Sequence, residues 1–437
     1  MLLNKKKLIL SGADKKEQEA RRKILEILEF SVKSGDPFFL TQKALRQIDF
    51  GKFKNIYVIG AGKGSYRLAA ATEKFLGKKI TAGWVSVPAI VGREKLKKIK
   101  ITLAGHPLPN KGSVLGAKRI LNLIKKAGAR DLVLGLFSGG ASALFCLPTT
   151  DITLKDKIKT TSLLLRSGAL IEEINAVRKH LSLIKGGRLA EACAKTNLVA
   201  FYLSDVVGND LSVVASGPTV PDKSTFATAW KIIKKYNLER KIPLTVDRRL
   251  FLGKSGKLRD TPKKLGKNIK NIIIGSHKTL ALAAIKKAKE LGFKAEILTN
   301  KMQGNTEIVG LDILRRLQKR KTGNIIIAAG ETTFKVKTVK PGGRNQQMVL
   351  VVLPKLKYGN LFLAFDSDGV DGVGPRKIGG AMASYATALQ AKKICVDPIK
   401  ALRENASYDF FKKVGGQIKT GYVGTNLGDI VLAINFS

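Results

Sequence analysis

The chain has 437 residues, of which 44% are hydrophobic and 26% charged, the composition of an ordinary globular protein. Its 79 Lys and Arg residues against 33 Asp and Glu residues give a formal net charge of +46. Its apolar runs fall short of the roughly 20 residues of a membrane-spanning helix, which argues against a membrane protein. Its three cysteines are far apart, which argues against a disulfide framework or a zinc site.

The N-terminal sequence MLLNKKKLILSGADKK has an apolar run too short for a secretory signal, so we expect a cytoplasmic protein. Residues 17–30 then show the apolar spacing of a helix, which Gly35-Asp36-Pro37 ends. Strands and helices alternate from there. In order, the predicted segments are a strand and helix within 56–76, a strand at 82–87, a helix at 113–126, a strand from Leu132, a helix at 171–194 broken at Gly186-Gly187, and a strand at 198–204.

A cation-rich stretch at 231–270 interrupts this alternation. After it, the predicted segments are strand 271–276, helix 278–291, strand 294–298, helix 308–317, strand 325–329, a strand or helix at 346–350, strand 361–365 and helix 381–392. We therefore predict two α/β domains, at 1–232 and 269–437, with a basic linker or surface excursion at 233–268. The simplest architecture places the active site in a cleft between the two domains.

Most of the predicted strands end in a loop of Gly, Ser, Asp or a lone cation. Apolar runs of this kind are typical of strands buried on both faces of a parallel sheet. In open α/β sheets, ligands bind outside the carboxyl ends of the strands. The sequence thus predicts an α/β enzyme that acts on a phosphorylated substrate or a nucleotide.

The first such loop is Gly60-Ala61-Gly62-Lys63-Gly64-Ser65, between a strand and a helix. Glycines allow close backbone approach, a helix N-terminus attracts anions, and Lys63 adds a positive charge suited to a phosphate or carboxylate. Gly62, Gly64 and Ser65 are therefore candidate phosphate-binding residues. The alternative is a tight turn with Lys63 in solvent.

A second loop, at 138–142, has the same position after a strand. The backbone N–H groups and hydroxyls of Ser138, Gly139, Gly140 and Ser142 could hold an anion. Ser138 lacks the GxSxG pattern of a nucleophile elbow. The alternative is turn chemistry alone, and the same structural interpretation is given to His106 in GHPLPN.

Carboxylates follow two further strands, at Asp205 and Asp210 and at Asp366, Asp368 and Asp371. Mg²⁺ is usually held by one or two carboxylates together with phosphate and water. These aspartates could equally form turns or cap helices. Separately, Arg344 follows two glycines, and its guanidinium suits bidentate binding of a carboxylate or phosphate.

Taken in order, these segments resemble the class II glycerate 2-kinases, whose C-terminal half is the MOFRL domain. The matching segments are VIGAGKGS, GHPLPN, SGGASAL, NAVRKHLSLIKGGRLA, SDVVGNDLSVVASGPTVPD, GETTF, GGRNQQ, DSDGVDG and TGYVGTNLGDI. The resemblance implies a Rossmann-like N-terminal domain and a MOFRL-type C-terminal domain. It also implies transfer of the ATP γ-phosphoryl group to the 2-hydroxyl of D-glycerate, with Mg²⁺ as the metal, and leaves a homodimer open.

The family's lysine and arginine fall on Lys63 and Arg344, which we assign as catalytic together with Asp205. Asp205, Asp210 and Asp368 are the expected metal ligands, and one of the carboxylates would accept the hydroxyl proton. The anion-binding candidates are Gly62, Gly64, Ser65, Ser138, Gly139, Gly140, Ser142, Arg178, Lys185 and Asn345.

The chain also departs from the family pattern at several acidic positions. Asn209, Gln347 and Asn110 stand where acids are frequent, and Val373 to Lys377 replaces a segment that carries a carboxylate. These changes either weaken metal binding or belong to the acid-poor composition of the whole chain.

Two alternative functions remain at this point. The first is an oxidoreductase of the hydroxypyruvate reductase type, although no acidic residue follows a complete GxGxxG at the usual distance. The second is a catalytically degenerate, basic nucleic-acid-binding protein. The lysines are spread along the chain without a nucleic-acid-binding motif, so we interpret the charge as a general lysine bias and expect no specific nucleic acid partner.

Overall fold

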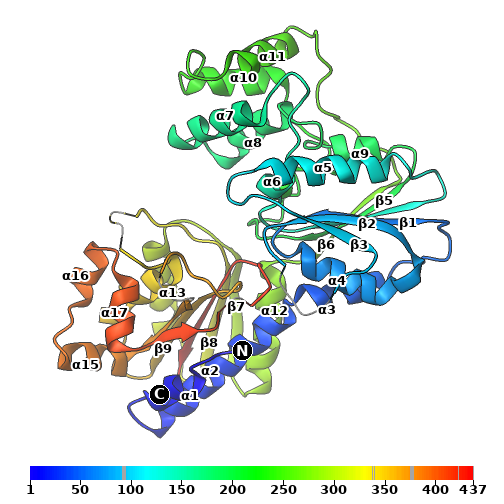
Figure 1. Ribbon diagram of the computed structural model, residues 1–437. Helices are drawn as coiled ribbons and strands as arrows, with labels where there is room; N and C mark the ends of the chain where they lie inside the picture. The colour runs from blue at the N-terminus through cyan, green and yellow to red at the C-terminus, as the bar shows by residue number, and fades with distance from the viewer. Residues whose placement is uncertain (91–94, 337, 339, 375–377, 422, 437) are drawn as a thin grey trace. The chain divides into compact units, whose positions relative to one another are not determined.

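The computed structural model describes residues 1–90, 95–336, 338, 340–374, 378–421 and 423–436, so the altered segment at Pro375 to Lys377 lies outside the described residues. The chain forms two compact units (Figure 1). Unit 1 comprises residues 1–36, 205–208 and 275–437, and unit 2 comprises residues 37–204 and 209–274. This division differs from the expected one, because the first 36 residues group with the C-terminal part of the chain.

Unit 2 is built on a six-stranded sheet of order β3-β2-β1-β4-β5-β6. In that order the strands are β3 (Ile99–Leu103), β2 (Ile80–Val87), β1 (Ile56–Ala61), β4 (Leu132–Phe137), β5 (Asn197–Leu203) and β6 (Ile269–Gly275). Neighbouring strands from β3 to β5 are parallel. This is the strand order of a Rossmann sheet, which confirms the predicted Rossmann-like fold. β6, which was expected to open the C-terminal domain, belongs to this sheet.

The centre of this sheet lies at β1 and β4, which are buried along their whole length. The chain passes from β1 to β2 on one side and from β4 to β5 on the other, so the order of strands reverses between β1 and β4. Ligands of open α/β sheets bind at such a switch point, outside the carboxyl ends of the strands. The loops that follow β1 and β4 are the two Gly-rich loops predicted to bind anions.

Helices cover both faces of the sheet of unit 2, and Figure 1 shows α4 and α5 on opposite sides of it. The helices of unit 2 are α3 (Pro37–Leu45), α4 (Ser65–Leu76), α5 (Lys111–Ile124), α6 (Ala141–Leu144), α7 (Leu154–Arg166), α8 (Ile171–His180), α9 (Arg188–Ala192), α10 (Phe226–Lys235) and α11 (Leu244–Lys254), with 3-10 turns η1 (Gly77–Lys79) and η2 (Val214–Ser216).

A separate apolar cluster joins α7, α8, α10 and α11, which lie together in Figure 1. Each helix contributes fully buried side chains, such as Leu164, Val177, Ile233 and Leu250. The segment 233–268, expected as a linker or surface excursion, thus contains the end of α10 and the whole of α11. Its many lysines misled the prediction because they lie at the exposed ends of these helices and in the loops beside them, and therefore carry no information on the buried faces.

Unit 1 has a six-stranded sheet of order β11-β10-β9-β12-β8-β7. The strands are β7 (Lys294–Met302), β8 (Asn324–Gly330), β9 (Asn360–Asp366), β10 (Ile378–Ser384), β11 (Gln417–Lys419) and β12 (Asp429–Asn435). Only the pair β7 and β8 is parallel, so this described sheet is mixed. The apolar runs predicted burial on both faces correctly, but they could not specify the direction of a neighbouring strand.

β12 determines how polar groups meet at one edge of this sheet. It lies between β8 and β9 and is antiparallel to both, so β8 and β9 run in the same direction. The carboxyl ends of β8 and β9 and the start of β12 therefore lie side by side. In the register of the sheet, Asp429 pairs with Gly330 on one side and with Asp366 on the other.

The helices of unit 1 are α1 (Lys5–Leu10), α2 (Lys15–Ser34), α12 (His277–Glu290), α13 (Thr306–Gln318), α14 (Arg344–Val352), α15 (Tyr385–Lys393), α16 (Pro398–Arg403) and α17 (Ser407–Val414), with a 3-10 turn η3 (Leu353–Lys355). The segment at 346–350 is thus helical. The helix predicted at 381–392 begins only at Tyr385, because Ala381 to Ser384 complete β10, where they are buried against β9.

α2 belongs to unit 1 because of its packing and its polar contacts. Its apolar face, which includes Ile24 and Leu28, is fully buried, and the helix packs against α12. The Arg21 guanidinium is 1% exposed, pairs with Glu17 at 2.7 Å and donates to Ser384 Oγ at 2.7 Å. Residues more than 360 positions apart are therefore bonded inside this unit.

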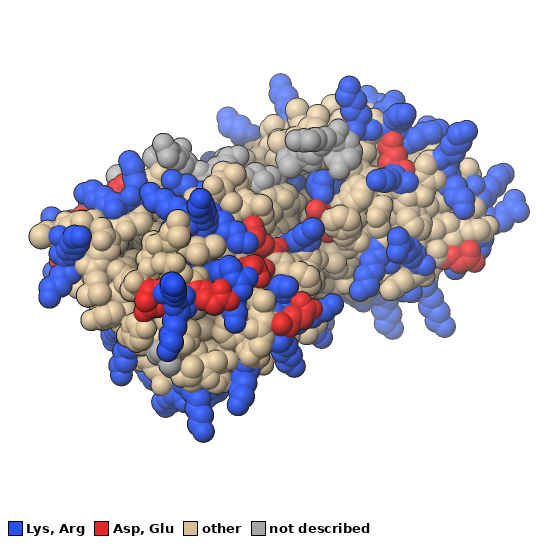
Figure 2. Space-filling view, turned by 90° about the horizontal axis from the view of Figure 1, so that it is seen from below, with Lys and Arg blue, Asp and Glu red and all other residues tan. Residues whose placement is uncertain are grey.

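Lysine and arginine side chains are spread over the face of the molecule shown in Figure 2, where acidic side chains are few. This distribution is the one expected from a general lysine bias rather than from a single basic patch. In the described part of the chain, no helix combines the length and the apolar character needed to cross a membrane.

Candidate active site

The two Gly-rich loops of unit 2 are hydrogen-bonded to each other. The Lys63 N–H donates to the Gly139 carbonyl at 2.9 Å, and the Gly64 N–H donates to Ser138 Oγ at 2.9 Å. Ser65 Oγ donates to the carbonyl of Leu136 at 2.9 Å. Ser65 and Ser138 are buried, so their hydroxyl groups join the loops and do not face solvent. The predicted anion-binding loops thus form one structure at the switch point.

Lys63 and His106 flank the second loop at Gly140. A Cβ atom on Gly140 would lie 3.2 Å from Lys63 Cγ and 3.0 Å from His106 Cδ2, and Gly140 has φ +82°. Partial burial lowers the pKa of His106, and the charge of Lys63 lowers it further. Within the described residues, no carboxylate or carbonyl pairs with the half-buried Lys63 ammonium group. The arrangement offers one cation and one uncharged imidazole to an anion.

On the other side of the second loop, Ser142 Oγ lies 3.0 Å from Ser216 Oγ. Arg178, on α8, is half-buried. The Lys185 side chain is fully buried and donates to the carbonyl of Ala215 at 2.9 Å. Burial lowers the pKa of Lys185 to about 7, an effect that the Cys146 thiol opposes and that the charges of Lys157 and Arg178 increase. Lys185 therefore lies behind the surface that a ligand would meet.

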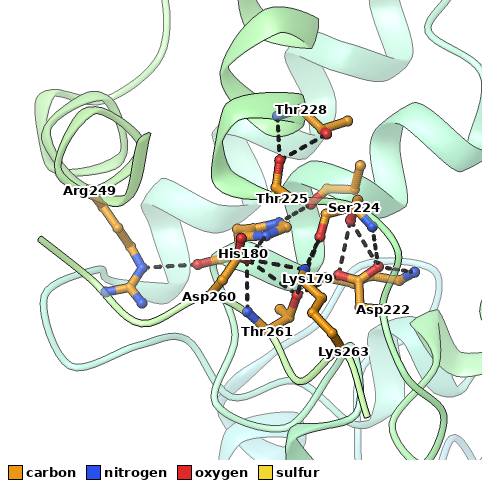
Figure 3. A network of polar contacts seen from close by, with 11 residues as sticks. Lys179, His180, Asp222, Ser224, Thr225, Thr228, Arg249, Asp260, Thr261 and Lys263 are labelled. Carbon is orange, nitrogen blue, oxygen red and sulfur yellow. Dashed lines mark hydrogen bonds and ion pairs between the residues drawn. The ribbon is translucent and has the colours of Figure 1, made fainter. Parts of the chain in front are cut away.

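A polar network holds the end of α8 in place (Figure 3). Lys179 pairs with the buried Asp222 at 3.1 Å, and His180 Nε2 lies 2.7 Å from Asp260 Oδ1. Asp222 also accepts from Ser224 and Thr261. Burial raises the pKa of Asp260, but the hydrogen bonds from His180 and the Thr261 N–H outweigh it and give a net lowered pKa. The network fixes the position from which Arg178 and Lys185 project.

In unit 1, Arg344 is the centre of a carboxylate cluster. Its Nε donates to Asp429 at 2.7 Å, Nη1 to Glu331 at 2.9 Å and Nη2 to Asp366 at 3.0 Å. The three carboxylates come from the start of β12, the residue after β8 and the end of β9, which meet at one edge of the sheet. Arg344 itself begins α14, and its side chain is 25% exposed. The guanidinium is therefore held on three sides.

Negative charge exceeds positive charge in this cluster. Burial raises the pKa of Asp366 well above its ordinary value, and the carboxylates of Asp368 and Asp429 raise it further, against the effect of Arg344. Burial also raises the pKa of Glu331; Arg344 opposes this shift, and Asp205 and Asp429 add to it. Five carboxylates thus interact around one guanidinium, a formal excess of four negative charges.

Asp371 and Asn345 organise the start of α14. Asp371 accepts the backbone N–H groups of Asn345 and Gln346, at 2.9 and 2.8 Å, and so caps the helix. Burial raises the pKa of Asp371 to about 6, although these hydrogen bonds oppose the shift. The Asn345 amide also donates to Asp429 at 2.8 Å. Asn345 is fully buried and orders the carboxylates rather than facing a ligand.

Comparison with known proteins agrees with both halves of this description. Residues 23–251 match the model of a domain of unknown function (DUF4147), and residues 324–429 match that of the MOFRL family. The chain is 37% identical over 428 residues to the glycerate 2-kinase of Pyrococcus horikoshii, covering 94% of this chain and 96% of that one. The chain belongs to the glycerate kinase family.

Other relatives also match over nearly the whole chain. The D-glycerate 2-kinase of Thermotoga maritima is 35% identical over 428 residues, covering 96% of this chain and 99% of that one. The crystal structure of a Thermotoga maritima glycerate kinase matches with a TM-score of 0.87 and 34% identity, covering 96% of this chain and 100% of that one. A relative from Agrobacterium vitis, 35% identical over 429 residues (94% and 93% of the two chains), bears the provisional name hydroxypyruvate reductase.

The metal ligands expected for a glycerate kinase are only partly brought together. The Asp210 carboxylate accepts the Ser212 N–H at 2.8 Å and that of Asp368 accepts the Val370 N–H at 2.8 Å, which are turn-forming contacts. Asp205 accepts from Asn426 at 3.2 Å. In the described part of the chain, no group of three or more His, Cys, Asp or Glu side chains is arranged to hold a metal. Asp205 nevertheless interacts electrostatically with Glu331, and Asp368 with Asp366, so both lie near the carboxylates around Arg344. No such interaction is described for Asp210.

Sequence reasoning missed several residues of these two sites. Glu331 and Asp429 were not singled out, although Glu331 directly follows the apolar run of β8, in GETTF, and Asp429 directly precedes that of β12, in NLGDI. His106 was interpreted as a turn residue, yet it lies beside Lys63 and Gly140. For Glu331, the available indication was an acidic residue directly after a predicted strand.

Proposed function

We propose that this chain is a glycerate 2-kinase, an ATP-dependent enzyme that transfers the γ-phosphoryl group to the 2-hydroxyl of D-glycerate and releases 2-phosphoglycerate and ADP. The observation that carries the proposal is similarity along almost the entire chain to glycerate 2-kinases, at 37% and 35% identity. The joined Gly-rich loops at the switch point of unit 2, with an unpaired cation, suit a phosphorylated ligand.

Phosphoryl transfer depends on positioning and on neutralising charge more than on covalent catalysis. In this proposal, Lys63 stabilises the phosphoryl group that is transferred. Its backbone N–H is bonded to Gly139, so the loop that carries the side chain is fixed before a ligand binds. Such preorganised charge does not have to be reoriented during the reaction.

Arg344 has a second electrostatic role in the proposal. A guanidinium carries five N–H donors, and three of those of Arg344 are used on carboxylates of its own unit. One N–H on each terminal nitrogen remains for an oxygen of the substrate or nucleotide. The three carboxylates fix the orientation of these two remaining N–H donors. Asp205 is the proposed acceptor of the proton that the substrate hydroxyl releases.

Mg²⁺ fits the excess negative charge of the cluster around Arg344. Mg²⁺ usually takes one or two protein carboxylates and completes its shell with phosphate and water, so a cage of three protein ligands is not required. Asp205 and Asp368 would hold the Mg²⁺ ion, whereas the Asp210 carboxylate stabilises a turn by accepting the Ser212 N–H. When bound, the metal would neutralise phosphate charge, and the protein residues described above would orient the reacting groups.

A coupled assay tests the proposed activity. Purified protein is incubated with D-glycerate and MgATP, and 2-phosphoglycerate is detected by enolase as phosphoenolpyruvate at 240 nm. ATP-dependent product is expected. Phosphorylation of other hydroxy acids but not of glycerate would change the acceptor, and absence of ATP turnover with any of them would reject the kinase. NADH oxidation with hydroxypyruvate in a parallel reaction would instead support the oxidoreductase.

A further inference from the structure

The turn η2 in unit 2 has an unusual backbone. Ala215, Ser216 and Gly217 have φ values of 55°, 59° and 62°, so three successive residues are left-handed. Residues with a side chain adopt this conformation at a cost in free energy, and they persist in it only where the surrounding structure enforces it. Such positions are concentrated at functional sites, which makes the surroundings of this turn informative.

The segment Lys185 to Gly187 enforces this conformation with three successive hydrogen bonds. Lys185 Nζ donates to the Ala215 carbonyl at 2.9 Å, the Gly186 N–H donates to the Ser216 carbonyl at 3.1 Å, and the Gly187 N–H donates to the Gly217 carbonyl at 2.7 Å. The three carbonyl groups therefore point toward one segment. Lys185 therefore helps to hold the turn η2 in its left-handed conformation.

The turn in this way presents the Ser216 hydroxyl to two other elements. Ser216 Oγ donates to Asn175 Oδ1 at 2.9 Å and lies 3.0 Å from Ser142 Oγ. Because the Ser216 proton is used on Asn175, Ser142 donates to Ser216. Asn175 is 2% exposed, and within the described residues its amide nitrogen donates to no other group. Arg178 lies three residues further along α8, on the same helix face as Asn175.

The charges around this group are positive and unneutralised. In the described residues, no carboxylate contacts the side chain of Arg178, Lys185 or Lys157. The ionisable groups that act on Lys185 are the Cys146 thiol after α6, Lys157 on α7 and Arg178 on α8. Positive charge behind the amide N–H of Asn175, which has no other acceptor among the described residues, favours an anion, because buried charge is weakly screened.

We propose that Asn175 and Arg178 bind the carboxylate of the hydroxy-acid substrate, with Ser216 and Ser142 orienting Asn175 and the buried Lys185 behind them; this assignment rests on the proposed function. A planar guanidinium and neutral donors match a carboxylate of single charge. The loop at 138–142 connects this carboxylate pocket to Lys63. In this proposal, the same loop therefore lies next to the carboxylate of the hydroxy acid and next to the hydroxyl that receives the phosphoryl group. Lys185 acts as a positioning residue, and Arg178 contacts the ligand.

Steady-state kinetics with the full chain test the pocket. We expect Arg178→Met and Lys185→Met each to raise the KM for D-glycerate at least tenfold and to leave the KM for ATP within twofold. The matched controls are Arg166→Met, an exposed arginine at the end of α7, and Lys159→Met, an exposed lysine of the same helix. Both controls should keep the KM for D-glycerate within twofold.

A second readout separates a binding role of Lys185 from a purely structural one. At pH 8, binding of D-glycerate should draw a proton onto Lys185, and calorimetry in two buffers of different ionisation enthalpy measures this uptake. Uptake in the wild type and its loss in Lys185→Met support the pocket. If Lys185→Met does not fold, Ser216→Ala takes its place. The same tenfold rise in the KM for D-glycerate is expected for this variant.

The outcomes distinguish this pocket from the proposed function. If the wild type phosphorylates glycerate and the pocket variants keep its KM, the pocket is wrong and the function stands. A rise in the KM for ATP alone would assign the pocket to nucleotide phosphate and overturn the proposal. If the wild type does not phosphorylate glycerate, calorimetry with D-glycerate and L-lactate decides: binding lost in Arg178→Met supports a carboxylate pocket, and absence of binding overturns it.

Discussion

Gly62 and Ser138 lie so close together that no side chain fits between them. A Cβ atom on Gly62 would stand 2.1 Å from Ser138 Oγ and 2.6 Å from the Ser138 carbonyl oxygen. Gly62 also has φ +140°, and its N–H donates to the Ser86 carbonyl at 3.2 Å. The approach of the two Gly-rich loops, and with it the position of Lys63, depends on this glycine.

Gly62→Ala should therefore reduce kcat/KM by at least about 100-fold, because a small misplacement of a catalytic group is costly in rate. The fold should remain, as judged by far-UV circular dichroism. Gly77→Ala is the matched control, since Gly77 has a positive φ of 53° but no atom within 4 Å of an added Cβ. Equal loss of activity in both variants would mean that backbone strain, not the contact with Ser138, is responsible.

Lys63→Ala should lower kcat by about 10²–10³-fold, the usual effect of removing one preorganised electrostatic group from a transition state. Stability should hardly change, because no described group pairs with this ammonium. Lys78→Ala, an exposed lysine of the same unit, should keep full activity. Near wild-type turnover in Lys63→Ala would refute the catalytic assignment.

Arg344→Ala should also lower kcat by orders of magnitude, and it should make stability depend on pH. Without the guanidinium, the pKa values of Asp366 and Glu331 rise further above their unfolded values. The folded state then binds more protons, so the free energy of unfolding falls as pH rises from about 4 toward neutrality.

Urea unfolding at pH 5 and pH 8 measures this effect. The deficit of Arg344→Ala relative to wild type should grow with pH, to about 3 kcal/mol at pH 8. Arg316→Ala removes an exposed ion pair with Asp312 in the same unit and should show a small deficit that does not change with pH. A deficit for Arg344→Ala that is constant with pH would contradict the described cluster.

Lys185→Met should also lose stability relative to wild type as pH rises, but over a more alkaline range than Arg344→Ala. The pKa of Lys185 is about 7 in the folded protein, below its ordinary value of 10.5, so between these values the unfolded chain binds more protons. Wild-type stability therefore gains a contribution as pH rises through this window, on the order of 3 kcal/mol between pH 7 and pH 10.

The variant lacks this contribution, so the stability of Lys185→Met relative to wild type should decrease over the same range. Urea unfolding at pH 7, 8.5 and 10 measures it. Lys118→Met, on the exposed face of α5, provides a control for which the difference should stay flat. A flat difference for Lys185→Met would mean that its ammonium group is solvated.

Arg21→Ala should destabilise unit 1 by about 3–5 kcal/mol, because it leaves the buried Glu17 carboxylate without a partner. Both tryptophans, Trp84 and Trp230, are in unit 2, so their fluorescence reports that unit alone. We expect circular dichroism to show an early unfolding phase that tryptophan fluorescence does not follow. Arg22→Ala, which removes exposed ion pairs of the same helix, should cost less than about 1 kcal/mol.

The sequence was sufficient for most of the fold of unit 2, because its central strands are continuous apolar runs. β1 and β4 are buried on both faces, an environment in which six successive apolar or glycine residues are typical. The assignment of 233–268 was less successful because its lysines outnumber the few apolar side chains, such as Val246 and Leu250, that anchor α11. Strand direction in unit 1 depended on β12, whose pairing partners lie far away in the sequence.

The candidate site was predicted at the level of its loops and not of its contacts. Arg344 was expected to present an open guanidinium, but its carboxylate partners lie 13, 22 and 85 residues away, and only folding brings them together. Lys185 was expected to touch an anion, and the apolar residues before it in SLIKGG were the indication that it is buried. Local sequence patterns contain no information on such distant partners.

The grouping of α2 with α12 has a consequence for synthesis of the protein on the ribosome. More than 240 residues separate the two helices, and all of unit 2 is made between them. At about 5–20 residues per second, the apolar face of α2 waits roughly 10–50 s for its partner helix to emerge. Unit 2 can fold during that interval, whereas the apolar face of the nascent α2 stays exposed to solvent until α12 has been made.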